Sequence, residues 1–178
     1  MTPDDTDHFP KLEYLGDALQ FVPRMRELLQ HIDLFEDFSV TELEHLAVYM
    51  ACYRAPAGTE IITEGEPGSF MLIVIEGAVE IIKKDSTGLP NRIGSAGPGK
   101  TLGEMSLIDG EPRFASCIST SELVFAVLDR ERLSRVISGE PNIGVKILME
   151  LLMLLNQRLR SVSQQLMNCL EKRAPRIS

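Results

Sequence analysis

The feature that most constrains the fold is a series of short apolar runs between residues 50 and 128, separated by glycines. Runs rich in Val, Ile and Phe follow Gly58, Gly68 and Gly77, and further runs come later as ASCI and LVFAVL. Short strands with a turn signal every eight to twelve residues predict an antiparallel barrel or jelly roll. No long helix fits between these runs, so we expect a β-roll over residues 49–128.

The two ends of the chain show helical patterns instead. Apolar residues recur at helical spacing from Leu12 to about Gln30. Ser39 lies three residues before Glu42, which is the reciprocal capping arrangement of a helix start. Ser-Gly-Glu-Pro at 138–141 separates two further helical patterns and predicts a hinge between them.

These patterns predict an α+β chain built as one β-roll flanked by helices. We expect a flexible tail at 1–11, N-terminal helices at 12–48, the roll at 49–128, a hinge with two C-terminal helices at 129–172, of which the last is long, and a tail at 173–178. The 178 residues suit a single domain with appendages.

Charge and cysteine usage exclude several classes of function. The net charge is −8, but residues 141–178 hold six basic and two acidic side chains, so residues 1–140 carry −12. Such a body repels nucleic acid. Three distant cysteines without a C-x-x-C pair, and His8, His31 and His45 without neighbouring ligands, predict no metal site and a reducing compartment. No signal peptide or membrane span is apparent, and we expect a cytoplasmic protein.

One motif suggests nucleotide hydrolysis. Gly94, Gly99, Lys100 and Thr101 match the P-loop pattern G-x-x-x-x-G-K-[ST]. A P-loop needs a long helix at its Lys-Thr end and a parallel sheet. The glycines and proline in LGEMSLIDGEPR leave room for only one or two turns. The sequence therefore favours a binding protein over an enzyme.

The segment LGEMSLIDGEPRFAS at 102–116 supports a second interpretation. Its Gly-Glu pair, short apolar turn and Gly-x-Pro-Arg followed by a small residue nearby resemble the phosphate-binding cassette of the cyclic nucleotide-binding domain family. That family includes bacterial catabolite activator proteins and the regulatory subunit of protein kinase A. APAGTEIITEGEPGSFMLIVIEGAVEII is similar to the family's strands, and the resemblance covers residues 32–170.

The resemblance implies a site for a cyclic nucleotide, with cAMP or cGMP as the expected ligand. Arg113 is expected to be exposed and to grip two phosphate oxygens with its planar guanidinium. Backbone N–H groups near Gly103, Met105 and Ser106 would add oriented partial positive charge. Glu104 would accept a hydrogen bond from the ribose 2′-hydroxyl. Phe114 and Ala115 complete the expected binding residues in the cassette, and Ser163 on the last helix is expected to contact the ligand in the closed pose.

Two positions depart from the family pattern. The residue after the phosphate arginine is usually small, whereas this chain has Phe114. Either the ligand sits differently or the site is degenerate. In the activator proteins a Thr-Ser pair on the long helix reads adenine, and here that pair falls at Val162 and Ser163. Val162 cannot form a side-chain hydrogen bond, so the identity of the nucleotide is not determined, and cyclic dinucleotides are also candidates.

The last helix carries a heptad pattern that predicts a homodimer. Its apolar residues alternate by four and three, and we call this stripe the seam: Leu148, Leu152, Leu155, Leu159, Val162, Leu166 and Cys169. The alternative is that the stripe packs on the roll of its own chain. In the family, such helices swing onto the cassette when ligand binds.

The sequence thus predicts a non-enzymatic cyclic nucleotide sensor that signals through its C-terminal helices to an unknown protein partner. We expect no DNA-reading segment after the last helix, so the chain acts on a partner protein, is a free-standing sensor or is a fragment of a longer regulator. Neither nucleic acid nor membrane is expected as a partner. The alternative is a degenerate, ligand-free fold kept for dimerisation or protein interaction. A Phe114 side chain clear of the site favours sensing, and one that fills it favours degeneracy.

Overall fold

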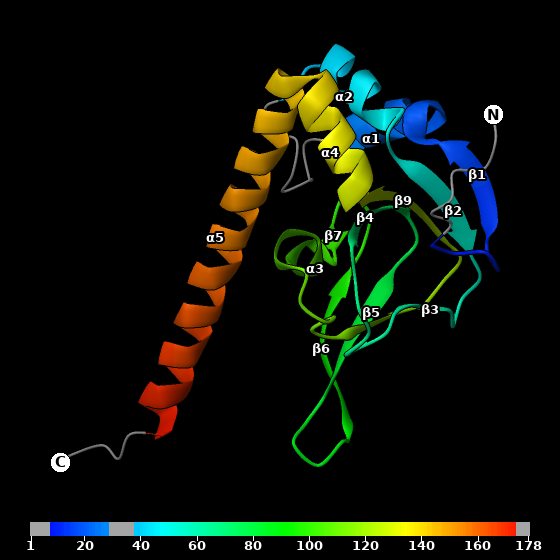
Figure 1. The fold of residues 1–178 in the computed structure, drawn as a ribbon. Helices are drawn as coiled ribbons and strands as arrows, with labels where there is room; N and C mark the ends of the chain where they lie inside the picture. The colour runs from blue at the N-terminus through cyan, green and yellow to red at the C-terminus, as the bar shows by residue number, and fades with distance from the viewer. Residues whose placement is uncertain (1–7, 29–37, 174–178) are drawn as a thin grey trace.

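The computed structural model describes residues 8–28 and 38–173, and it contains two antiparallel sheets with helices on one side (Figure 1). One sheet has the strand order β1-β2-β9-β4-β7, and the other has the order β3-β8-β5-β6. The strands are β1 Glu13–Asp17, β2 Ala51–Ala55, β3 Glu60–Ile62, β4 Phe70–Glu76, β5 Val79–Lys84, β6 Pro90–Ala96, β7 Thr101–Leu102, β8 Ser116–Ser119 and β9 Leu123–Asp129. The predicted α+β β-roll is confirmed.

The helices lie at both ends of the chain, except for one short helix between β7 and β8. They are α1 Val22–Leu28 after a 3-10 turn at Ala18–Phe21, α2 Val40–Ala47, α3 Glu104–Asp109, α4 Arg130–Gly139 and α5 Pro141–Arg173. The capping box predicted at Ser39 is present, because the Ser39 side chain accepts from the Glu42 N–H and the Glu42 carboxylate accepts from the Ser39 N–H. Only Glu140 separates α4 from α5, at the predicted hinge.

The N-terminal part of the chain differs from expectation. Residues 13–17 form a strand that pairs with β2, with a bulge at Gly16, and not the start of a helix. An edge position on a sheet overrides local helical spacing because pairing satisfies the backbone groups. Phe9 also packs against the rings of Tyr53, Phe70 and Phe125. The prediction of a flexible tail through residue 11 is therefore wrong for 8–11, while 1–7 and 174–178 lie outside the described residues.

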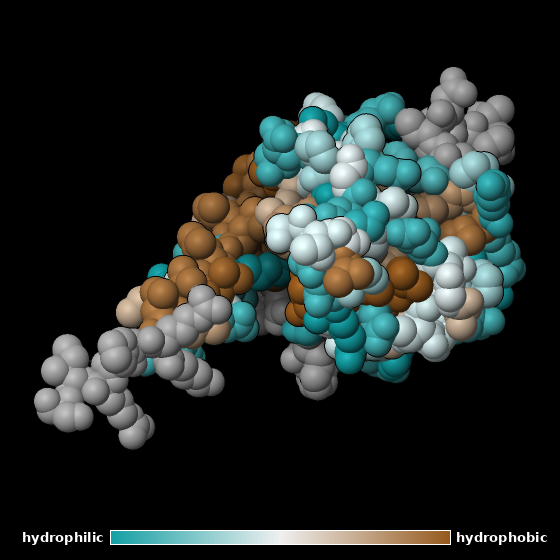
Figure 2. Space-filling view, turned by 90° about the horizontal axis from the view of Figure 1, so that it is seen from below, coloured by the Kyte–Doolittle hydropathy of each residue, from teal (hydrophilic) through white to brown (hydrophobic). Residues whose placement is uncertain are grey.

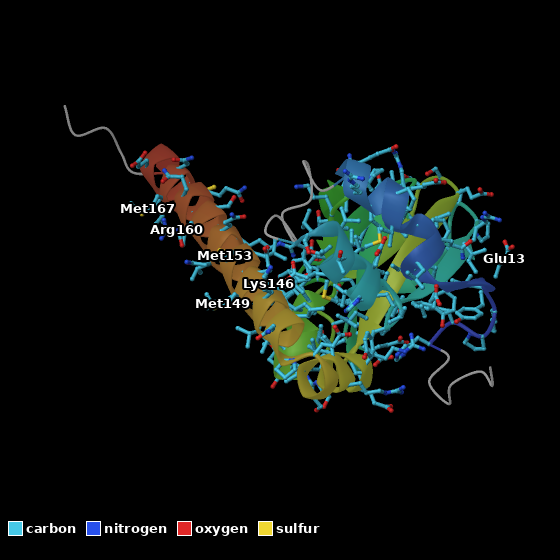
Figure 3. All side chains as sticks on the ribbon, turned by 90° about the horizontal axis from the view of Figure 1, so that it is seen from above. Glu13, Lys146, Met149, Met153, Arg160 and Met167 are labelled. Carbon is cyan, nitrogen blue, oxygen red and sulfur yellow. The ribbon has the colours of Figure 1, made fainter. Side chains whose placement is uncertain are left out.

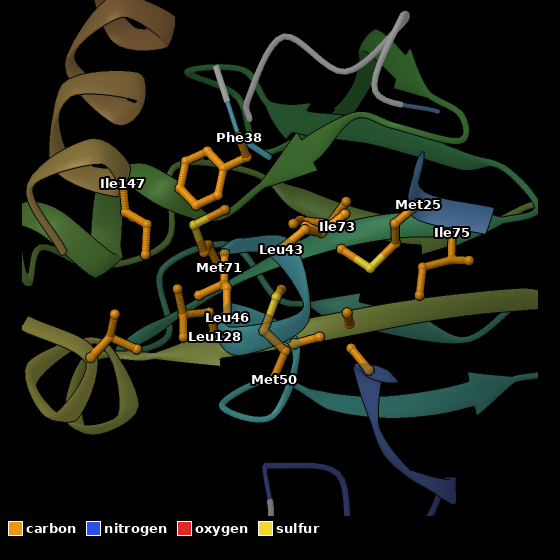
Figure 4. Close-up of a cluster of buried hydrophobic side chains, with 14 of the residues drawn as sticks. Met25, Phe38, Leu43, Leu46, Met50, Met71, Ile73, Ile75, Leu128 and Ile147 are labelled. Atoms are coloured by element: carbon orange, nitrogen blue, oxygen red, sulfur yellow. The ribbon is translucent and has the colours of Figure 1, made fainter. Parts of the chain in front are cut away.

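Two apolar clusters hold the roll and its helices together. Along β4 and β9, residues alternate between the helix side and the inside of the roll, as strand geometry requires. Met71 and Ile73 lie on the helix side with Leu43 and Ile147 (Figure 4), and the inner cluster is built on other residues such as Phe125. α4 and the first half of α5 are thus part of one core with the β4–β9 sheet.

The long helix α5 has a packed half and an exposed half. Ile143, Ile147, Leu151 and Leu154 are buried against the helix-side cluster. From Asn156 to Glu171 the side chains are exposed, except that Arg158 is half-buried. After Arg158, which still contacts Glu104 and Thr101, the helix leaves the body of the molecule, and Figure 1 shows the C-terminal end of α5 standing apart from the roll.

Ionic contacts join α2 to the hinge and to α5. The Lys146 ammonium lies 2.6 and 2.8 Å from the two oxygens of Glu42, and His45 Nδ1 lies 2.6 Å from Glu140 Oε2. The pKa of Glu42 is lowered to about 2, first by the hydrogen bond from Lys146 and then by those from Ser39. A depressed pKa means that the charged form stabilises the fold above pH 4.5, and this stabilisation is lost as the pH falls toward 2.

We therefore expect Lys146→Met to lower the melting temperature at pH 7 by about 1–4 °C. The difference from wild type should shrink as the pH falls from 4.5 toward 2, which thermal melts over that range would show. Arg24→Met, which breaks the exposed pair of Arg24 with Glu27, is the matched control and should change little. A Lys146→Met difference that does not vary with pH would mean that Lys146 acts instead through the Phe38 ring, whose centre lies 5.7 Å from Nζ.

Candidate ligand-binding site

The cassette (residues 102–116) forms a turn, a short helix and a second turn between β7 and β8. Gly103 precedes α3 with a left-handed φ of 80°, and Gly110 ends it with a φ of 76°. No side chain caps the N-terminal N–H groups of α3 at Gly103. The positive φ values explain why the sequence needs glycine at both ends of α3.

Arg113 is buried beneath this helix and is not exposed as the sequence analysis expected. Its side chain is 4% exposed, and Nη1 donates to the carbonyls of Phe70 at 2.7 Å and Gly103 at 3.0 Å. Its guanidinium also lies 4.1 Å from the centre of the Phe70 ring. Burial lowers the pKa of Arg113 from its ordinary value, but arginine stays protonated in proteins. The charge is therefore fixed in place before any ligand arrives.

Two glycines leave the space that Arg113 occupies. A Cβ atom on Gly68 would lie 2.1 Å from Arg113 Nε, and one on Gly103 would lie 2.5 Å from Arg113 Nη1. Gly68 precedes β4 and Gly103 precedes α3, so the two turns close around the guanidinium from different strands. The glycines that suggested turns in the sequence thus also form a cradle for this side chain.

Glu104, the first residue of α3, is the second buried charge of the site. Its side chain is almost fully buried, and Oε1 accepts a hydrogen bond from Arg158 Nη1 of α5. Arg158 Nη2 also donates to the Thr101 carbonyl at 2.9 Å. Nothing in the sequence predicted a role for Arg158, because local spacing does not reveal a contact between residues that are 54 positions apart.

The site retains unused hydrogen-bonding capacity on both charged groups. Arg113 Nη2 and Glu104 Oε2 are buried and have no hydrogen-bond partner. Buried polar atoms are nearly always paired, since an unpaired one costs about 1–3 kcal/mol. A free donor and a free acceptor beside one short helix are what a ligand with an anionic oxygen and a hydroxyl would satisfy.

Phe114 is exposed and contacts β5. Its ring is 56% exposed and lies under the Lys83 ammonium of β5, at 4.7 Å from the ring centre. Lys83 is in turn paired with Glu64 at 2.7 Å. The described contact of the Phe114 ring is thus with Lys83 and not with the buried Arg113 and Glu104 side chains, which favours sensing over degeneracy.

The remaining predicted residues are divided between the cassette and the far side of α5. Ser106 and Ala115 are buried, whereas Met105 is exposed. Ser163 is exposed and comes five residues after Arg158, which places it about 140° around the helix. The structure therefore brings Gly103, Glu104 and Arg113 together but does not bring Ser163 to them.

The P-loop motif falls between two strands. Gly94 lies in β6, Thr101 begins β7, and β6 pairs antiparallel with β5. α3 then has six residues, so the long helix and parallel sheet of a P-loop are missing here. Among the described residues no group of three His, Cys, Asp or Glu could hold a metal ion, and His31 lies outside them. No described helix is long and apolar enough to cross a membrane.

The roll, the cassette and the closing helices define a regulatory ligand-binding domain of the β-roll type. The chain belongs to the cyclic nucleotide-binding domain family. The family model for that domain matches residues 53–140. A crystal structure of a cyclic nucleotide-binding domain from Methylobacillus flagellatus is 36% identical with a TM-score of 0.82, and the match covers 98% of this chain and 96% of that one.

Two bacterial regulators are also similar. The CRP-like cAMP-activated global transcriptional regulator of Mycobacterium tuberculosis is 30% identical over 142 residues, which are 80% of this chain and 62% of that protein. The catabolite activator protein of Thermus thermophilus is 28% identical with a TM-score of 0.69, over 75% of this chain and 61% of that one. The chain therefore matches about three fifths of the length of each regulator.

The cradle around Arg113 generates a stability prediction. Gly68→Ala should lower the melting temperature by about 2–8 °C, because the added methyl displaces a buried guanidinium from two carbonyls. Gly97→Ala is the control, since a Cβ there meets nothing within 4 Å, and it should change the melt by about 2 °C or less. Equal melts for the two variants would show that the space beside Gly68 is not needed by Arg113.

Proposed function

We propose that this chain is a non-enzymatic cyclic nucleotide sensor whose ligand binds at the cassette. The observation that supports this most directly is the pair of unpartnered buried atoms, Arg113 Nη2 and Glu104 Oε2. A cyclic phosphate would accept from Arg113 Nη2, and the ribose 2′-hydroxyl would donate to Glu104 Oε2. Arg113 is already held by Phe70 and Gly103, so little side-chain entropy is lost on binding.

Two observations guide the choice of nucleotide to test: the ligand of a similar protein and the residue types on α5. The Mycobacterium tuberculosis regulator is cAMP-activated, so cAMP is the first ligand to test and cGMP the second. Val162 is exposed on α5 and carries no hydrogen-bonding group. Recognition of the adenine amine by a side chain at that position is therefore excluded, and a cyclic dinucleotide belongs in the same test.

The Glu104–Arg158 contact gives a physical route from the ligand to the output helix. In the structure, Arg158 of α5 already uses Glu104 Oε1. A ribose hydroxyl that donates to Glu104 would weaken the attraction between Glu104 and Arg158. It would thereby change the free energy of the α5 position seen here. A ligand shifts a pose only through such a difference in affinity between states.

The seam supports assembly into a homodimer. Leu148, Leu152, Leu159, Val162 and Leu166 are between 40% and 65% exposed. The stripe that packs on the roll is a different one, built on Ile147, Leu151 and Leu154. The view in Figure 2 shows apolar residues gathered along α5. A second copy of the chain would cover this face, and its α5 would run beside this one.

The second candidate function is a ligand-free dimerisation or interaction module. The exposed seam favours it as much as it favours the sensor, because the seam does not depend on a ligand. The two candidates differ at the cassette, where a ligand-free module needs no free donor and acceptor. In both cases an unknown protein partner would bind α5. Neither nucleic acid nor membrane is proposed as a partner.

Thermal melts test ligand binding. Binding only to the native state adds about 2.7 kcal/mol at a hundredfold excess over Kd, which means a shift of roughly 5–10 °C for a chain of this size. We expect such a shift with cAMP, cGMP or cyclic di-GMP. Glu104→Gln should weaken the shift, and Arg113→Lys should abolish it because lysine cannot hold two carbonyls and a phosphate in one plane.

Because Arg113 is buried, the variants also need an unliganded melt. Arg113→Lys should itself lower the melting temperature, so loss of binding counts only if the unliganded protein still unfolds cooperatively. Phe114→Ser is the matched control in the cassette, and it should bind as wild type does. No shift with any of the three nucleotides at millimolar concentration would reject the sensor in favour of the ligand-free module.

The seam generates a separate prediction about assembly. Leu159→Glu with Leu166→Glu would place like charges in a dimer interface without disturbing the roll, because both side chains are exposed. Light scattering should show monomers for this variant and dimers for wild type. Met153→Glu is the control, since Met153 is also exposed on α5 (Figure 3) but is not one of the seam positions. A wild type that is monomeric at tens of micromolar would refute the homodimer.

A further inference from the structure

The C-terminal end of α3 is held by a side chain from α4. Arg130 donates to the Leu107 carbonyl from Nε at 3.1 Å and from Nη2 at 2.8 Å, and Nη2 lies 3.2 Å from the Ser106 carbonyl. The last four carbonyls of a helix have no partner within it and carry partial negative charge. The Arg130 guanidinium therefore satisfies the Leu107 carbonyl, shares the Ser106 carbonyl with the Gly110 N–H, and opposes the partial negative charge at this end of the helix.

The turn after α3 leaves space for this guanidinium. Gly110 ends α3 with a φ of 76°. A Cβ atom at Gly110 would lie 3.2 Å from both Nη1 and Nη2 of Arg130. Glycine is thus required here by the backbone conformation, and a Cβ would also push the end of the Arg130 side chain away by a few tenths of an ångström. The contact is a close fit between two segments that are distant in the sequence.

The main chain of Arg130 is fixed as firmly as its side chain. Its N–H donates to the Ser69 carbonyl at 2.8 Å, and it is the first residue of α4. The preceding Asp129 caps α4 by accepting from the Arg132 N–H at 2.7 Å. Since both ends of the Arg130 side chain are anchored, α3 cannot shift along its axis without moving the start of α4 or breaking these hydrogen bonds.

We propose that Arg130 is a positioning residue that transmits a ligand-driven displacement of α3 to α4. The inference rests on the proposed function, because it needs a ligand at Glu104 and Arg113. Arg158 of α5 binds the first residue of α3, Glu104, and Arg130 binds its last turn. α4 and α5 thus hold the two ends of α3. Because Glu140 breaks the helix between them, each of the two can move separately when α3 is displaced.

Hydrogen exchange of the whole protein tests this in two steps, the first without ligand. Arg130→Met keeps the length of the side chain but removes the guanidinium, and it should speed amide exchange at the end of α3, from Leu107 to Gly110, by about tenfold. Arg130→Lys keeps the positive charge but loses the planar guanidinium that donates from two nitrogens, and it should give a smaller increase in the exchange rate. Arg135→Met is the control on the same helix, where Arg135 pairs with Glu131 at 2.9 Å, and it should leave α3 unchanged.

The second step adds saturating cAMP, or whichever of the three nucleotides shifts the melt. In wild type, ligand should change exchange in both α3 and α4. In Arg130→Met the Kd should stay within about threefold and the change in α3 should remain, while the change in α4 is lost. A full α4 response in Arg130→Met, or unchanged exchange of α3 without ligand, would overturn the inference. If wild type binds no nucleotide, it is the proposed function that fails, and the first step still decides whether Arg130 holds α3.

Discussion

The site depends on one buried cation, the guanidinium of Arg113. It lies under α3 between Gly68 and Gly103, and it binds the carbonyls of Phe70 and Gly103. A charge that is removed from water must be compensated, so these carbonyls and the Phe70 ring fix the relative positions of β4 and the cassette. The remaining unpartnered Nη2 atom is what leaves the site able to bind an anion. One interaction thus supports both the local fold and the proposed chemistry.

Much of the fold follows from the sequence because its signals are local. Turn glycines such as Gly58 and Gly77 need left-handed backbone, and the runs between them have the period of strands. The capping box at Ser39 and the helix break at Glu140 likewise depend on residues that are close together in the sequence. The strand at Glu13–Asp17 was missed because it forms only by pairing with β2. No local propensity distinguishes it from the start of a helix.

The site was predictable in its residue types but not in its geometry. The order of Gly103, Glu104 and Arg113 identified the cassette. The cassette pattern gave no indication that Arg113 would be buried, because its burial depends on contacts with Phe70 of β4. The arginines that hold α3, Arg130 and Arg158, come 20 or more residues after the cassette begins. Contacts of that range depend on how the helices return to the roll, and charge periodicity does not encode this.

The division of α5 into a packed half and an exposed half has a mechanical consequence. Leu154 is the last side chain buried in the core, and Arg158 is bound to Glu104 one turn later. Beyond Arg158 the helix extends for about 22 Å, at 1.5 Å per residue. It is therefore a lever arm whose fulcrum lies beside the cassette. A tilt of about 10° there would displace its end by about 4 Å, and the core would not need to repack.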